Sequence, residues 1–186
     1  MSSYTEPRCV FLGFTIDTNR INARQADSDM NQLEQWREDG LIDVIMAESA
    51  YEEARAGGNA LRARKVGLQI FSMTLANTEG EQDGLKQIES ILFPGGATTQ
   101  NEKNDIDIVF NAKKYRRILV TSDGGSKRQP DGILGNRKAL AAIGVTVMTA
   151  PEAVALVRGK IQARDERARR LSREDSTPLP DWVGKD

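Results

Sequence analysis

Apolar positions along the chain fall into two kinds of pattern, short continuous runs and helical spacings. The runs lie at Cys9–Ile16, Leu41–Met46, Ile118–Val120 and Val145–Met148. Continuous runs of this length are typical of strands buried on both faces of a parallel sheet. Apolar residues between the runs recur at helical spacing. The pattern predicts a three-layer α/β/α sandwich with right-handed crossovers around a mostly parallel sheet of four to five strands.

Cap and turn residues set the expected limits of the helices. Helices are expected after Asp27, at 47–56, at 81–93, at 104–112, at about 135–143, and from Thr149 onward. A polar linker is expected at 97–104, and 59–76 fits either helix or strand. From Gly159 the chain becomes highly charged. The sequence therefore predicts one domain over 1–158, followed by a solvated charged helix and a loose tail over 159–186.

Composition excludes several kinds of chemistry. The chain has no histidine, which rules out Ser-His-Asp triads, His-ligated zinc and histidine general acid–base catalysis. Cys9 is the only cysteine, so there is neither a disulfide nor a thiolate metal cluster. The net charge of −1 gives no global attraction to a polyanion or a membrane. The polar N-terminus and the short apolar runs predict a cytoplasmic protein without a membrane partner.

Two acidic residues come directly after predicted strands. Asp17 follows the first strand, and Asp123 follows the strand at Ile118–Val120. Because the carboxyl ends of parallel strands share one edge of a sheet, these side chains are expected to lie close together at that edge. Either aspartate alone is more simply a helix cap or a turn residue. The conjunction of several acids at one edge favours a metal site.

A third acid lies on the apolar face of the helix expected at 104–112. Asp105 shares a helical stripe with Ile108, Val109 and Ala112, so a helix that buries this stripe turns the carboxylate inward. Asp107 lies on a polar stripe instead. The pattern therefore selects Asp105 as the inward acid.

A fourth acid is expected on the helix at 47–56, where three glutamates compete. Glu53 lies beside the small residues Ala50 and Gly57, the side expected to pack inward. Glu52 lies on a solvated side, and Glu48 stands at the helix start in the position of a cap. Glu53 is the preferred candidate, with Glu52 and Glu48 as the alternatives.

Carboxylates gathered at one edge require a counter-ion. Two unit charges about 4 Å apart repel by about 4 kcal/mol at an effective dielectric constant near 20. A hard divalent cation such as Mg²⁺ or Mn²⁺ removes this repulsion and can activate a bound water. The matching substrate is a phosphodiester, whose oxygens such a cation can also bind.

The motifs together resemble the PIN-domain ribonucleases. They are Asp17-Thr18-Asn19 after a strand, an acid on the second helix, Asp105 seven residues before Ala112, and Thr121-Ser122-Asp123 after a strand. The acids occur in the order found in that family, and the resemblance extends over about Val10–Val157.

This resemblance implies a metal-dependent endoribonuclease that cuts single-stranded RNA and leaves a 5′-phosphate. The implied ligands of Mg²⁺ or Mn²⁺ are the catalytic acids Asp17, Glu53, Asp105 and Asp123. Asn19, Thr121 and Ser122 would orient waters or phosphate, and Arg20, close behind Asp17, is placed to contact phosphate. The family also includes bacterial toxins, so an antitoxin-like or other regulatory protein and a second copy of the chain are candidate partners.

Two other readings of the same residues remain open. The first is a PIN-like fold without activity that binds RNA or protein. The second is a phosphohydrolase with Asp17 as nucleophile, a class that usually carries another aspartate two positions on, where this chain has Asn19. The arginines at 158–173 are read as a solvated face, with partner binding as the alternative.

Overall fold

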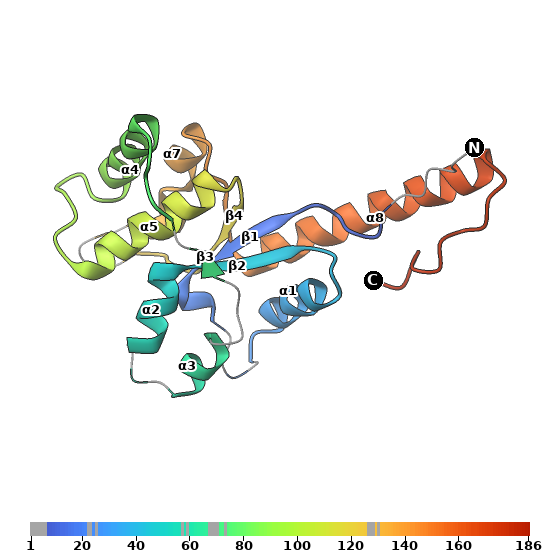
Figure 1. Ribbon diagram of the computed structural model, residues 1–186, viewed down its shortest axis with the longest axis horizontal. Helices are drawn as coiled ribbons and strands as arrows, with labels where there is room; N and C mark the ends of the chain where they lie inside the picture. Colours follow the sequence, from blue (N-terminus) through green and yellow to red (C-terminus); the bar gives the residue numbers. More distant parts are fainter. Residues whose placement is uncertain are drawn as a thin grey trace.

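A computed structural model describes residues 7–21, 24, 26–56, 58, 60–66, 71–72, 74–125, 129 and 131–186. Within them the chain builds a five-stranded sheet in the order β3-β2-β1-β4-β5, and every neighbouring pair is parallel. The strands are β1 (Gly13–Ile16), β2 (Asp43–Ala47), β3 (Phe71–Ser72), β4 (Ile118–Val120) and β5 (Val147–Met148). The predicted α/β sandwich with a parallel sheet is confirmed (Figure 1).

The continuous apolar runs form the centre of this sheet. Phe14 of β1 pairs in register with Val44 of β2 on one side and Ile118 of β4 on the other. Phe14 is fully buried and Val44 is 1% exposed, as expected for strands covered on both faces. Because β1 is the middle strand, the residues after it emerge between the ends of β2 and β4.

The helices lie at α1 (Ser28–Glu38), α2 (Glu48–Ala56), α3 (Ala60–Val66), α4 (Glu79–Leu92), α5 (Gln100–Lys114), α6 (Gly132–Gly135), α7 (Arg137–Ala142) and α8 (Ala150–Glu174). A 3₁₀ turn, η1 (Thr18–Arg20), follows β1 directly. Helix α5 packs against β1, β2 and β4, and α1 packs against β2 and α8. The region 59–76, which fitted either helix or strand, contains both α3 and β3.

Helix α5 begins earlier than the sequence pattern suggested. Residues 100–104 were expected to be part of a polar linker, but they form the first turn of α5. Thr99 Oγ1 accepts a hydrogen bond from the Glu102 amide, and the Glu102 carboxylate accepts one of 2.8 Å from the Thr99 amide. This capping box starts the helix. Asp105 consequently lies in the second turn of α5 rather than at its opening.

Helix α8 continues through residue 158 without a break and extends beyond the sandwich (Figure 1). Its far half is not wholly solvated, because Arg164 and Asp165 are each only 5% exposed. The tail is not loose either. The Arg164 guanidinium lies 4.4 Å from the ring centre of Trp182, and Asp186 pairs with both Arg8 and Arg164. Charge pairing and ring stacking fold the tail back onto the helix, which a composition rich in charge did not indicate.

Among the described helices, none combines the length and the apolar character that crossing a membrane requires.

Candidate active site

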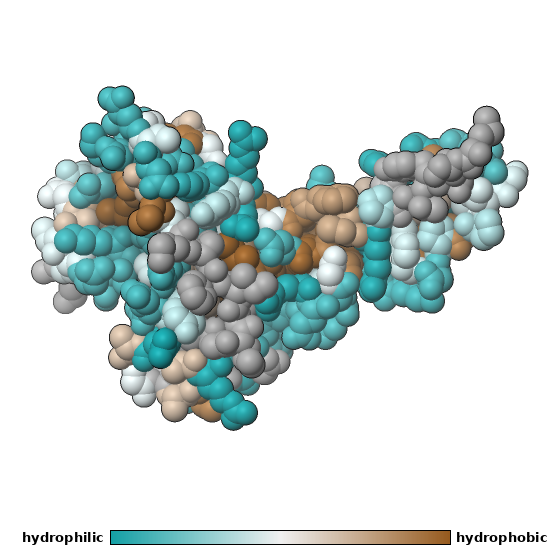
Figure 2. Space-filling view, in the orientation of Figure 1, coloured by the Kyte–Doolittle hydropathy of each residue, from teal (hydrophilic) through white to brown (hydrophobic). Residues whose placement is uncertain are grey.

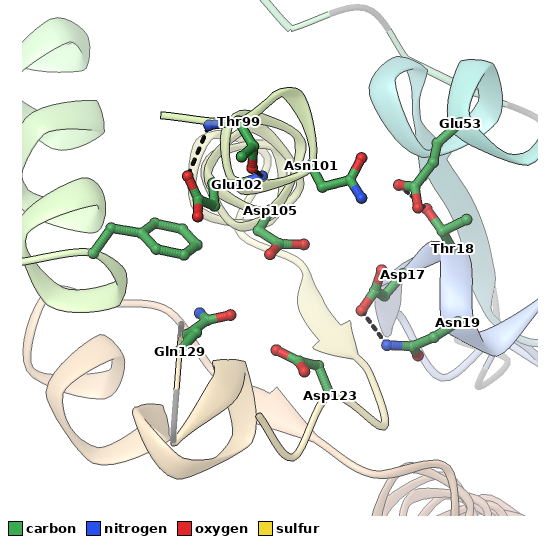
Figure 3. A pocket seen from close by; sticks show the side chains of 11 residues that line it. Asp17, Thr18, Asn19, Glu53, Thr99, Asn101, Glu102, Asp105, Asp123 and Gln129 are labelled. Carbon is green, nitrogen blue, oxygen red and sulfur yellow. Dashed lines mark hydrogen bonds between the residues drawn. The ribbon is translucent and has the colours of Figure 1, made fainter. Parts of the chain in front are cut away.

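The carboxyl edge of the sheet carries a cavity of about 410 Å³. Acidic side chains from α2, from α5 and from the ends of β1 and β4 lie around it, as Figure 3 shows. Its lining comprises Asp17, Thr18, Asn19, Glu53, Phe93, Thr99, Asn101, Glu102, Asp105, Asp123 and Gln129. All four acids selected from the sequence are therefore brought to one cavity by the topology of the sheet.

Asp17 follows β1 and is held from several sides. Its Oδ2 accepts hydrogen bonds of 2.6 Å from Thr121 Oγ1 and 2.7 Å from Asn19 Nδ2. The carboxylate is nearly sealed from water, since Asp17 is only 4% exposed. Burial raises the pKa of Asp17 to about 6, against the lowering effect of the hydrogen bonds from Thr121 and the Thr18 backbone. Repulsion from Asp123 and Glu53 adds to the rise.

Asn19 connects the end of β1 to the end of β4. Its side-chain nitrogen donates to Asp17 and to Thr121 Oγ1, and its oxygen accepts from the amide and the hydroxyl of Ser122. Thr121 is fully buried and its Oγ1 also accepts from the Asp123 amide at 2.9 Å. Thr121 therefore contacts Asp17 and Asp123 rather than the open cavity, and Asn19 and Ser122 brace the same edge.

Asp123 is oriented by the loop that follows β4. Its Oδ2 accepts a hydrogen bond of 2.8 Å from the Ile133 amide, and its Oδ1 accepts one of 3.1 Å from the Gly125 amide. Gly132, at φ +57, makes this possible, because a Cβ there would lie 2.4 Å from the Gly125 nitrogen and 2.9 Å from Asp123 Oδ2. Only glycine combines this backbone conformation with such a close approach.

Asp105 reaches the cavity from α5. Burial is the main cause that raises the pKa of Asp105 to about 8, followed by repulsion from Asp17 and Asp123. Asp107, two residues on, does not line the cavity, and its carboxylate accepts a hydrogen bond of 2.6 Å from Ser49 Oγ on α2. The helical stripe thus correctly predicted that Asp105, and not Asp107, faces the cavity.

Glu53 reaches the cavity from α2. Its Oε2 accepts a hydrogen bond of 3.1 Å from Thr18 Oγ1, which joins α2 to η1. Of the three glutamates weighed on this helix, only Glu53 lines the cavity, while Glu52 is exposed and Glu48 is half-buried at the start of α2. The placement agrees with the small-residue argument that selected Glu53.

The acids are gathered but not drawn tightly together. Among the described residues, no three acidic, cysteine or histidine side chains meet in a ready-made metal-binding group. Mg²⁺ commonly keeps several waters and uses only one or two protein carboxylates directly. The donor set, which consists of carboxylate and amide oxygens, fits such a hydrated hard cation, and the raised pKa values of Asp17 and Asp105 mark negative charge that a cation would offset.

Arg20 is not brought into this cavity. Its guanidinium pairs with Asp27, and both residues line a separate hollow next to η1. Lys127 and Arg128, two cations that follow Asp123 closely in the sequence, lie outside the described residues.

Five further residues of the cavity wall were not anticipated from the sequence. They are Phe93, Thr99, Asn101, Glu102 and Gln129. The Thr99-x-x-Glu102 capping pattern could have placed the start of α5 and with it Asn101. Phe93 and Gln129 carry no such signal, because their approach depends on how α4 and the loop after β4 pack.

Comparisons with known proteins add little to this geometry. No family model matches the chain, and no curated protein sequence matches it. Among solved structures, one that resembles part of this chain is that of VapBC2 from Rickettsia felis, which is bound to a DNA fragment from the VapBC2 promoter. The identity is 14%, the TM-score is 0.47, and the alignment covers 74% of this chain and 98% of the other. At this level of similarity the comparison assigns neither a family nor an activity.

Proposed function

We propose that this chain is a PIN-like endoribonuclease that hydrolyses phosphodiester bonds of single-stranded RNA with the help of Mg²⁺ or Mn²⁺. The observation that carries the proposal is the convergence of Asp17, Glu53, Asp105 and Asp123 on one cavity from four elements. Caps and turn residues have no physical reason to share one cavity. A gathering of mutually repelling carboxylates, one buried and three half-buried, is typical of a functional site.

The residues that would hold the cation are Asp17, Asp105 and Asp123, with Glu53 at the far side. When bound, a hard divalent cation lowers the pKa of a coordinated water and offsets charge on the phosphate oxygens. The chain itself keeps the carboxylates in place. Thr121 and Asn19 hold Asp17, the Ile133 and Gly125 amides hold Asp123, and Thr18 holds Glu53.

The cavity also carries neutral side chains that suit the rest of the substrate. Phe93, Asn101 and Gln129 provide an aromatic edge and two amides beside the acids. Such groups can contact a base or a ribose, while the carboxylate of Glu102 on the same wall is engaged by the Thr98 and Thr99 amides. The acidic cavity is therefore compatible with a single strand that presents its backbone to the carboxylates.

Cleavage of a labelled panel of single-stranded RNAs tests the proposal, with Mn²⁺, with Mg²⁺ and with EDTA in parallel. Wild type should cut only with the cations, and Asp17→Asn and Asp105→Asn should each lose most of the activity. Asp107→Asn is the matched control for Asp105→Asn, because it lies on the same helix and asparagine can still accept the Ser49 hydrogen bond. Glu52→Gln is likewise the matched control for Glu53→Gln, which should also lose activity.

Two results would overturn this function. One is a wild-type protein that cuts no RNA in the panel with either cation, which favours a binding module without activity. The other is cleavage that survives in EDTA or in Asp17→Asn, which would place the chemistry elsewhere.

A further inference from the structure

The outer part of α8 carries an excess of positive charge. Residues 158–174 contain seven lysines and arginines but only three acidic residues. We call this stretch the basic arm. It forms the half of α8 that extends beyond the sandwich (Figure 1). The whole chain has a net charge of −1, so the positive charge of the arm is local.

On the inner face of the basic arm, Arg164 is paired with acidic residues of the helix and of the tail. Arg164 pairs with Asp165 at 2.7 Å and with Asp186 at 3.0 Å, and its guanidinium lies against the Trp182 ring. Arg8, from the segment before β1, also pairs with Asp186. These contacts tie the helix, the tail and the N-terminal segment together, so the arm is braced where it leaves the sandwich.

The outer face carries further cations that are exposed to solvent. Arg158, Lys160, Arg167, Arg169, Arg170 and Arg173 are all exposed. The last four, with Ala163 and Glu166, line a hollow of about 540 Å³ along the helix. Figure 2 shows hydrophilic side chains over this outer part of the molecule. Glu174 lies 3.9 Å from Arg170, and because both side chains are about 60% exposed this ion pair offsets little of the positive charge.

We propose that the basic arm binds the phosphate backbone of single-stranded RNA at a place separate from the acidic cavity. Arginine forks match phosphate oxygens in pairs, and clustered arginines on one helix face form the usual electrostatic footprint of a nucleic-acid surface. A protein partner would need apolar anchors. The strongly exposed large apolar residues among the described ones are Phe11, Leu61, Leu75, Tyr115 and Leu179; none belongs to α8, and only Leu179 lies in the tail that folds back onto it.

The arm lies far from the acids because of the direction of α8. The helix starts at Ala150, just after β5 ends at the carboxyl edge, and runs back past the opposite edge. Arg167 is seventeen residues further along, or about 26 Å at 1.5 Å per residue. The arm therefore holds a strand at a distance from the point of cleavage. The choice of RNA as the polyanion rests on the proposed function, whereas the site itself does not.

Binding of a fluorescein-labelled single-stranded RNA, followed by anisotropy in EDTA over a range of KCl concentrations, tests the arm without cleavage. The variant Arg167→Gln/Arg170→Gln/Arg173→Gln removes three charges and keeps good helix formers. The slope of log K against log salt should become shallower by about 2, because each phosphate contact on a single strand contributes about 0.7. The affinity at low salt should fall at least tenfold.

The matched control removes three exposed charges from the body of the protein, as Arg64→Gln/Lys86→Gln/Lys138→Gln. This control should keep the wild-type slope to within a few tenths. Such a result would show that binding depends on the charges of the arm and not on the net charge of the protein. Equal slopes for the arm variant and wild type, equal losses in both triple variants, or no binding by wild type would each overturn the proposal. Equal slopes for the arm variant and wild type would indicate that the arm contacts a protein partner or only solvent. Because EDTA prevents metal-dependent cleavage, failure of the nuclease assay leaves this test unaffected.

Discussion

Thr121 and Asp17, 104 residues apart in sequence, form a buried hydrogen bond of 2.6 Å in which the hydroxyl donates to Oδ2 of the carboxylate. The contact joins the ends of β4 and β1. Thr121 is fully buried and meets the acids only through this hydroxyl. Its role is thus to position Asp17 and to lower the pKa of its carboxyl group.

Thr121→Val should reduce kcat for RNA cleavage by about 10–100-fold with little change in KM, the usual cost of losing a residue that orients a metal ligand. Without the hydroxyl the pKa of Asp17 rises above its present value of about 6. The acidic limb of the pH–rate profile should therefore move to higher pH. Thr121→Ser should restore both properties, and a Thr121→Val enzyme with an unchanged pH profile would contradict the positioning role.

Metal-free stability should fall as the pH rises, because of Asp105. The pKa of this carboxyl is about 8 in the folded protein against an ordinary value of 3.8, so the folded state binds the extra proton between those values. The free energy of unfolding must then decrease with pH over that window. Asp17 contributes in the same direction only up to about pH 6, where its own pKa lies.

Urea unfolding of Asp105→Asn and wild type in EDTA checks this pH dependence. At about pH 8 the variant should be more stable by on the order of 2 kcal/mol, and the difference should vanish near pH 4. Between about pH 6 and 8 the variant should show almost no slope. A wild-type stability that rises with pH over this range would contradict the environment assigned to Asp105.

Mn²⁺ should stabilise the wild-type fold at neutral pH. At a hundredfold excess over its Kd, a ligand that binds only the folded state adds about 2–3 kcal/mol. The rise in Tm should be largely lost in Asp17→Asn and Asp105→Asn but kept in Asp107→Asn, whose carboxylate lies outside the cavity. A rise of equal size in all four proteins would indicate that the cation binds elsewhere.

Gly132→Ala should disturb the site through Asp123. The new Cβ would lie within 3 Å of Asp123 Oδ2 and 2.4 Å from the Gly125 nitrogen, in addition to the backbone strain at φ +57. Gly144→Ala is the matched control, because Gly144 also has a positive φ, of +86, yet nothing lies within 4 Å of the added carbon.

Chemical denaturation and the Mn²⁺ response separate the two glycine variants. Gly144→Ala should cost about 1 kcal/mol and leave the response intact. Gly132→Ala should cost more than about 2 kcal/mol and weaken the response, because the loop must shift away from its present contacts. Equal stability losses in the two variants, together with an intact response in both, would show that the contact with Asp123 is unimportant.

Local pattern sufficed for most of the elements. The apolar runs located β1, β2, β4 and β5 and hence the edge at which Asp17 and Asp123 meet, since strand burial and turn chemistry act over a few residues. The helical stripe separated Asp105 from Asp107 for the same reason. The start of α5 was misplaced because the Thr99–Glu102 capping box was taken for linker.

The contacts that complete the site and the basic arm were decided by the tertiary structure. Thr121 and Asn19 reach Asp17, Thr18 reaches Glu53, and Phe93 and Gln129 close the cavity across separate elements. Asp186 likewise finds Arg164 only when the tail returns along α8. The sequence by itself determined which side chains stand at strand ends and on inward helix faces. Which of them touch depends on strand order and packing between distant segments, which periodicity does not encode.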